Sequence, residues 1–122
     1  GDLSYAIALS WHVTRGNVVA TGRRAEVAAR EALALCPQLA EFWVHQGVAL
    51  DMQARQTEAE PSFRRAIELG PTRPEWRYYL AYHLSARPGR LAEARAAVET
   101  CLTLDPSMAQ AEALRVRLAA DR

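Results

Sequence analysis

The chain has no lysine and few residues that bind metals or form disulfides: among 122 residues there are two cysteines and three histidines. Cys36 and Cys101 stand 65 residues apart, a spacing that fits neither a disulfide framework nor a zinc site. His12, His45 and His83 occur singly, so no helix would present two imidazoles at i and i+3 or i+4. The sequence therefore predicts no metal and no cofactor, and we interpret the cysteines as small buried thiols.

Long hydrophobic runs are also missing. No apolar stretch approaches the roughly 20 residues that a membrane-spanning helix needs. The chain starts Gly-Asp-Leu without a basic segment or an initiator Met. We therefore expect no membrane anchor and no signal peptide, and a chain that is processed or cut from a longer protein. Two free thiols favour the cytoplasm, with the periplasm as the alternative.

Excess charge of one sign is absent as well. Fifteen basic residues, all arginine, face fourteen acidic ones, for a net charge of +1. This balance argues against nucleic acid or an anionic membrane as the partner. Arginine without lysine, together with abundant alanine, indicates a GC-rich and bacterial gene. No glycine-rich dinucleotide or P-loop motif, no His-Glu-x-x-His and no Gly-x-Ser-x-Gly occurs, which predicts a protein without enzymatic activity.

A repeat of about 34 residues organises what is present. Three helix-like segments end alike, in Leu33–Pro37, Ile67–Pro71 and Leu102–Pro106, with prolines 34 and then 35 residues apart. An alanine-rich stretch with apolar residues at helical spacing precedes each ending. Proline stops a helix because it has no N–H and disfavours helix in the residue before it. The pattern predicts three helices that end near these prolines.

A second type of helix precedes each of these. It carries a small residue followed three positions later by a large one, as in Gly47 with Leu50 and Ala81 with Leu84. Ser/Thr-x-x-Glu/Gln pairs at 57–60, 72–75 and 107–110 predict capping boxes. No alternating pattern predicts a strand. We expect seven antiparallel helices, over residues 2–15, 22–35, 39–53, 57–69, 73–86, 90–103 and 107–120.

Residues 40–73 resemble the tetratricopeptide repeat (TPR). Seven of eight family positions match, with glutamine at position 46 where leucine is usual; the matches are Trp43, Gly47, Leu50, Ala59, Phe63, Ala66 and Pro71. Residues 74–108 match with one extra residue in the turn at 87–90. Residues 1–39 match as a degenerate repeat, with about five residues inserted within 15–22. The resemblance implies one all-α domain over 1–122, a right-handed superhelix of three helix pairs with a terminal helix at 107–120.

The resemblance further implies that the first helix of each pair lines a concave groove. In the second repeat the groove residues would be Glu41, Val44, His45, Val48, Asp51 and Met52. In the third they would be Glu75, Tyr78, Tyr79, Tyr82, Ser85 and Ala86. In the first they would be Asp2, Tyr5, Ala6, Leu9 and His12. Trp11, Trp43 and Phe63 would be core residues.

Three functions follow as hypotheses. The first is a scaffold that binds a peptide or helix of a partner protein in the groove. Carboxylate-clamp members of the family use Lys, Asn and Arg where this chain has Val44, Val48 and Tyr79, so we expect an apolar or basic segment instead. The second is a regulatory or anchoring segment of a larger bacterial enzyme. The third is self-association into a homo-oligomer.

Overall fold

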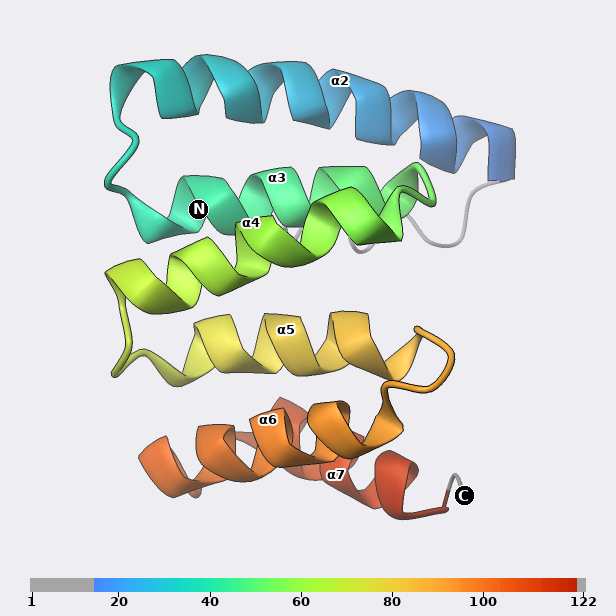
Figure 1. The fold of residues 1–122 in the computed structure, drawn as a ribbon, viewed down its shortest axis with the longest axis vertical. Helices are drawn as coiled ribbons and strands as arrows, with labels where there is room; N and C mark the ends of the chain where they lie inside the picture. Colours follow the sequence, from blue (N-terminus) through green and yellow to red (C-terminus); the bar gives the residue numbers. More distant parts are fainter. Residues whose placement is uncertain (1–14, 121–122) are drawn as a thin grey trace. The chain divides into compact units, whose positions relative to one another are not determined.

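The computed structural model describes residues 15–120 as six α-helices and contains no strand within that range. Figure 1 shows them joined by short turns. This confirms the predicted all-α fold. The predicted first helix, over 2–15, and with it the expected core residue Trp11, falls outside the described residues except at Arg15. The helices are α2 Arg15–Leu35, α3 Ala40–Met52, α4 Gln56–Leu69, α5 Pro74–Ser85, α6 Leu91–Leu104 and α7 Ala109–Ala120.

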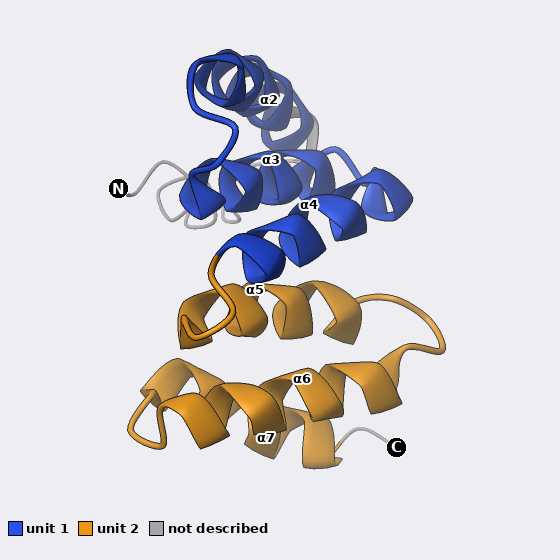
Figure 2. Ribbon diagram, turned by 60° about the vertical axis from the view of Figure 1, so that its left-hand side comes forward, with its two compact units in different colours: residues 1–69 blue, residues 70–122 orange. Residues whose placement is uncertain are grey.

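The helices form two compact units, residues 1–69 and 70–122 (Figure 2). In the first unit α3 packs against both α2 and α4. In the second unit α6 packs against α5 and α7, and α7 also contacts α5. Each unit thus builds its core from neighbouring helices joined by short turns, and a single domain over 1–122 stays a prediction.

Helix α2 is longer than predicted. It begins at Arg15 rather than near residue 22, so the residues interpreted as an insertion add turns to the helix. Gly22 lies inside it, where a Cβ atom would come within 2.9 Å of the Ala49 carbonyl oxygen and of Met52 Cβ. Val18, one turn earlier, is buried. Helix α2 therefore starts early because of tertiary packing. Gly22 has no side chain, which allows α2 to approach α3 closely.

The repeat positions form the core of each unit, as expected. Ala59, Phe63 and Ala66 on α4 are buried, and so are their counterparts on α6: Ala94, Val98 and Cys101. The departure at Gln46 is explained by a hydrogen bond, because its amide donates to the Ser62 hydroxyl at 3.0 Å. Ser62 is itself buried, so the two polar groups satisfy each other inside the α3–α4 pair.

One predicted core residue is less buried than expected. Trp43 is only half-buried, and its indole Nε1 donates to the Pro37 carbonyl oxygen at 2.8 Å. The equivalent residue 34 positions on, Arg77, makes a weaker contact of the same kind with the Pro71 carbonyl at 3.4 Å. A tryptophan with its N–H at the rim and its ring inside is typical of such boundary positions.

The prolines stop the helices as predicted: α2, α4 and α6 each end two residues before one. The capping boxes, by contrast, are wrong. Helix α5 starts at Pro74, so Arg73 and not Thr72 is its N-cap, and no side chain caps it. Proline suits this first position because its φ is fixed near the helical value. Thr57 lies inside α4. Ser107 donates its hydroxyl to Asp105 at 2.7 Å instead.

Candidate protein-binding surface

A tyrosine cluster on α5 is the most exposed of the predicted sites. The rings of Tyr78 and Tyr79 meet edge to face with centroids 5.8 Å apart, and Tyr78 lies 6.2 Å from Tyr82 at an angle of 46°. Tyr82 is 41% exposed, while the other two are half-buried. The hydrophobic residues of the same helix, Leu80 and Leu84, are buried on its other side. The cluster therefore gives α5 a broad aromatic face that reaches the surface.

The hydroxyl of Tyr78 stays protonated at neutral pH. Burial raises the pKa of Tyr78, the neighbouring tyrosines raise it further, and the charge of Arg117 lowers it by less. A neutral phenol both donates and accepts hydrogen bonds. The aromatic face can thus combine apolar contact with hydrogen bonds to a peptide backbone.

Arg117 on α7 belongs to this surface, although the sequence analysis did not include it. Its guanidinium lies 5.4 Å from the centre of the Tyr82 ring, and it donates to the Ser85 hydroxyl at 3.4 Å. Ser85 in turn donates to the Tyr82 carbonyl at 2.6 Å. The repeat period contained the signal, since Arg117 follows Tyr82 by 35 residues and therefore occupies the same repeat position.

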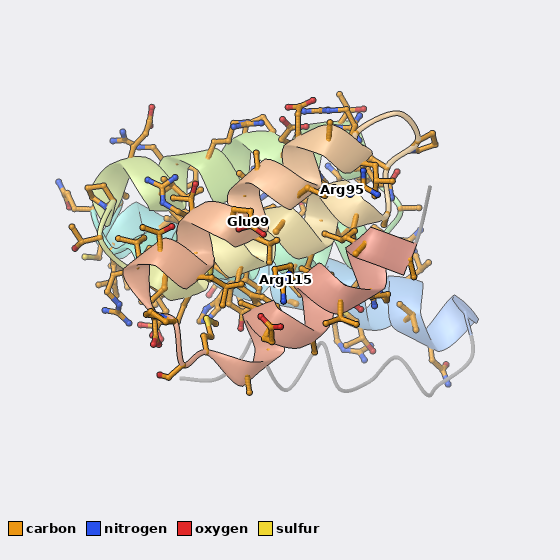
Figure 3. The ribbon with its side chains drawn as sticks, turned by 90° about the horizontal axis from the view of Figure 1, so that it is seen from below. Arg95, Glu99 and Arg115 are labelled. Carbon is orange, nitrogen blue, oxygen red and sulfur yellow. The ribbon has the colours of Figure 1, made fainter. Side chains whose placement is uncertain are left out.

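Contacts with α6 hold α7 in place. Arg95 of α6 donates from two nitrogens to the Leu118 carbonyl oxygen, at 3.2 and 2.7 Å, near the end of α7. Figure 3 shows Arg95 and Glu99 on α6 and Arg115 on α7, where the two helices run beside each other. The hydrogen bond to Glu112 raises the pKa of Arg115, and Glu99 adds a smaller effect. These contacts fix the helix that carries Arg117.

The predicted carboxylate Glu75 lies at the start of α5. It accepts a hydrogen bond from Arg73 at 3.3 Å. The guanidinium of Arg73 also lies 5.1 Å from the centre of the buried Trp76 ring. The negative charge expected at this end of the face is therefore balanced by a nearby cation.

The six predicted residues of α3 divide into two kinds. Glu41, Val48 and Asp51 are half-buried, whereas Val44, Met52 and His45 are only 1%, 4% and 6% exposed. Val48 packs against a core cluster that α2 and α3 share, formed by Val18, Ala25, Ala49 and Met52. Val44 and His45 consequently offer almost no surface to a partner. The predicted residues of the first repeat lie outside the described residues.

The pKa of His45 is lower than that of an ordinary histidine. Burial lowers the pKa of His45, and the charge of Glu41 one turn earlier opposes this effect without cancelling it. Within residues 15–120, its Nε2 atom has no hydrogen-bond partner. Its ring lies 6.1 Å from that of Phe42. The neutral imidazole therefore behaves as a core residue.

Other chemistry finds little support in the described part of the chain. No group of three or more His, Cys, Asp or Glu side chains there could hold a metal ion. Cys101 is buried and donates to the Pro74 carbonyl, and burial raises the pKa of its thiol, which disfavours a nucleophilic thiolate. Cys36 is partly buried. Within residues 15–120 no helix is both long enough and apolar enough to cross a membrane.

No family model and no curated protein matches the chain, but several solved structures do. The thermophilic TPR protein TTC0263 of Thermus thermophilus has a TM-score of 0.74 and 25% identity, over 97% of this chain and 57% of that one. This chain therefore spans little more than half of the Thermus protein. The TPR domain of Arabidopsis OM64 has a TM-score of 0.71 at 18% identity, over 99% and 100% of the two chains.

A third similar structure is the type III secretion chaperone SycD of Yersinia enterocolitica, in complex with a peptide of the translocator YopD. Its TM-score is 0.65 at 15% identity, over 97% of this chain and 85% of that one. The TM-scores show that this chain shares its overall fold with all three structures. The chain therefore has the all-α fold of tetratricopeptide-repeat proteins, the family that its repeat pattern resembles.

Proposed function

We propose that this protein is an interaction module that binds a peptide or helix segment of a partner protein on the face of α5 formed by Tyr78 and Tyr82. The site is not of the carboxylate-clamp type. The module acts by binding alone, without catalysis. In the other unit, Glu41 and Val48 on α3, both half-buried, are proposed separately as contacts to a partner.

The exposure of Tyr82 is the observation that carries this proposal. A tyrosine that is 41% exposed keeps a large amphipathic surface in water, next to the half-buried ring of Tyr78. Tyrosine provides contact area at a low entropic cost and is enriched among residues that dominate binding energy. The structure of SycD with a translocator peptide supports the idea that this fold can hold a peptide. At 15% identity it supports the fold only, so the assignment depends on the tyrosines.

The test is a selection of displayed random peptides, about 12 residues long, on the immobilised 122-residue chain, followed by affinity measurements on the selected peptides. We expect Tyr82→Ala and Tyr78→Ala each to weaken binding by about tenfold or more, as hot-spot truncations do. Leu104→Ala is the matched control. It removes a residue of similar exposure, 39%, in the same unit but on α6.

Circular dichroism and urea unfolding would show that the variants keep their fold. Peptides that bind wild type and both tyrosine variants equally well would reject the assignment to α5. A selection that yields no binding peptide would reject peptide binding as the function.

A further inference from the structure

We propose that the surface formed by Tyr82 and Arg117 recognises an acidic side chain next to an apolar residue within the partner segment. This inference rests on the proposed function and defines the chemistry of the partner at that site. The apolar residue would lie on the rings of Tyr78 and Tyr82. The glutamate or aspartate would bind the guanidinium of Arg117.

Arg117 lies next to the tyrosines, on the surface of α7. Its guanidinium lies 5.4 Å from the centre of the Tyr82 ring and is solvent-exposed. A guanidinium over an aromatic ring is held by cation–π attraction while its N–H groups point outward in the plane. Stacking therefore orients the cation without using the donors that would bind a carboxylate.

No carboxylate of the described part of the chain pairs with this cation. Among the described residues, the polar contact of Arg117 is the long one to the Ser85 hydroxyl at 3.4 Å, and no Asp or Glu pairs with it. Arg115, two residues earlier on the same helix, is paired: its Nε donates to Glu112 at 3.0 Å. Arginine presents several donors in a fork that fits a carboxylate with two parallel hydrogen bonds. Charge complementarity thus favours an acidic group on the partner.

This differs from the expectation of an apolar or basic segment. A basic segment would need an unbalanced carboxylate, such as that of Glu75, at this face. In the structure Arg73 donates to Glu75, so the carboxylate is balanced locally. The charge that lies over the Tyr82 ring is the positive one of Arg117. A basic peptide would be repelled at this point and an acidic one attracted.

The test uses a library of acetylated and amidated peptides of the same length, with one fixed leucine or phenylalanine at the centre and random residues elsewhere. Wild type, Arg117→Gln and Arg115→Gln each select from it. We expect wild type and Arg115→Gln to enrich Glu or Asp within two positions of the fixed residue. Arg117→Gln should lose this enrichment. Arg115→Gln is the matched control, because it removes an exposed charge from the same helix.

A double-mutant cycle then measures the contact. Replacing the selected glutamate by glutamine should weaken binding to wild type about three- to tenfold, as expected for a partly exposed charge-assisted hydrogen bond. The same change should have little effect on binding to Arg117→Gln. Wild-type binding should also weaken as the salt concentration rises.

Several outcomes would overturn the inference. Enrichment of neutral or basic residues would do so, and so would the same acidic enrichment on Arg117→Gln. Binding that needs a free C-terminal carboxylate, seen in a parallel library without amidation, would also contradict the assignment to an acidic side chain. If peptides without acidic preference still lose affinity with Tyr82→Ala, this inference fails and the proposed function stands. If no peptide depends on Tyr82, both fail.

Discussion

A Cβ atom on Gly47 would lie only 2.8 Å from Cζ of Phe63. The ring of Phe63, on α4, covers the backbone of α3 at this point and is 2% exposed. In the other unit the same two repeat positions hold Ala81 and Val98, both buried. The space between the two helices of a pair is therefore filled in two ways. Gly47 packs beneath the large ring of Phe63, and at the equivalent positions Ala81 is combined with the smaller side chain of Val98.

Gly47→Ala should destabilise the protein. The added methyl group would meet the ring at less than 3.0 Å, and overpacking of a core costs about 1–3 kcal/mol. Replacing glycine inside a helix regains about 1 kcal/mol of helix propensity. We expect a net loss of about 1 kcal/mol in the free energy of unfolding, measured with urea.

A partner substitution separates packing from propensity. Phe63→Val alone should leave a cavity and cost about 2–4 kcal/mol. In the double variant the alanine methyl occupies part of this space, as in the other unit. The loss should then be smaller than the sum of the single losses by about 1 kcal/mol. Strict additivity would contradict the steric explanation.

The end of α3 offers a stabilising substitution. Ala54 has a φ of 60°, and the N–H groups of Ala54 and Arg55 bond to the carbonyls of Asp51 and Leu50, both at 2.9 Å. This is a Schellman ending, in which the left-handed residue is usually glycine. Because the left-handed conformation costs an L-residue about 1–2 kcal/mol, Ala54→Gly should raise the free energy of unfolding by about 0.5–1 kcal/mol.

The control substitution, Ala113→Gly, should change the free energy of unfolding in the opposite direction. Ala113 is exposed in the middle of α7, where glycine should cost about 1 kcal/mol. Urea unfolding of both variants compares the two sites directly. A loss of stability in Ala54→Gly would show that Ala54 does not hold the left-handed conformation in solution.

Glu26 should make the protein sensitive to acid. This buried carboxylate of α2 accepts hydrogen bonds from Arg55 at 2.7 Å, from Gln53 at 3.0 Å and from Arg30 at 2.7 Å. Burial alone would raise the pKa of Glu26, but the hydrogen bonds and the charge of Arg55 together lower it below the ordinary value of 4.5. Because the pKa is lower in the folded state, the ionised carboxylate stabilises the fold at pH values above the unfolded-state pKa. This contribution is lost as the pH falls through the folded-state pKa.

At pH 7, Glu26→Gln should lower the free energy of unfolding by about 1–3 kcal/mol. As the pH falls below 4.5, the variant should lose less stability than wild type does. Urea unfolding between about pH 7 and pH 3 measures both effects. Glu112→Gln removes an exposed carboxylate that is paired with an arginine, and should have a smaller effect at pH 7. Equal effects of the two substitutions would refute the role of the buried network.

Most of the fold follows from the sequence because its signals are local. The prolines end helices through their own backbone chemistry, and the small residues of α3 and α5 mark where helices approach. The start of α2 could not be predicted in this way. Residues 15–22 contain two glycines and two β-branched valines, which are residues of low helix propensity. They form helix because Val18 and Gly22 pack against α3, and such contacts are invisible in a local window.

The candidate site was predictable only in part. Repeat positions placed Tyr78 and Tyr82 on one helix face, and the structure confirms that their rings adjoin. They place Arg117 at the repeat position equivalent to that of Tyr82, but they do not show that the two side chains meet, because the contact depends on how α5 and α7 pack. Nor did they separate surface from core on α3, where the depth of Val44 and His45 depends on how closely neighbouring elements pack.

The burial of His45 predicts a second pH dependence of stability, in a higher pH range than the one expected for Glu26. Burial lowers its pKa below the ordinary value of 6.5, so the unfolded chain binds a proton more readily than the folded one. Stability should therefore decline as pH falls through about 6.5 and level off once the folded imidazole is also protonated. His45→Leu keeps an apolar side chain in the core and removes the titration. Urea unfolding between about pH 8 and pH 5 should show this decline in wild type and a flatter profile in the variant. The same decline in His45→Leu would assign it to another group and contradict the burial of a neutral His45.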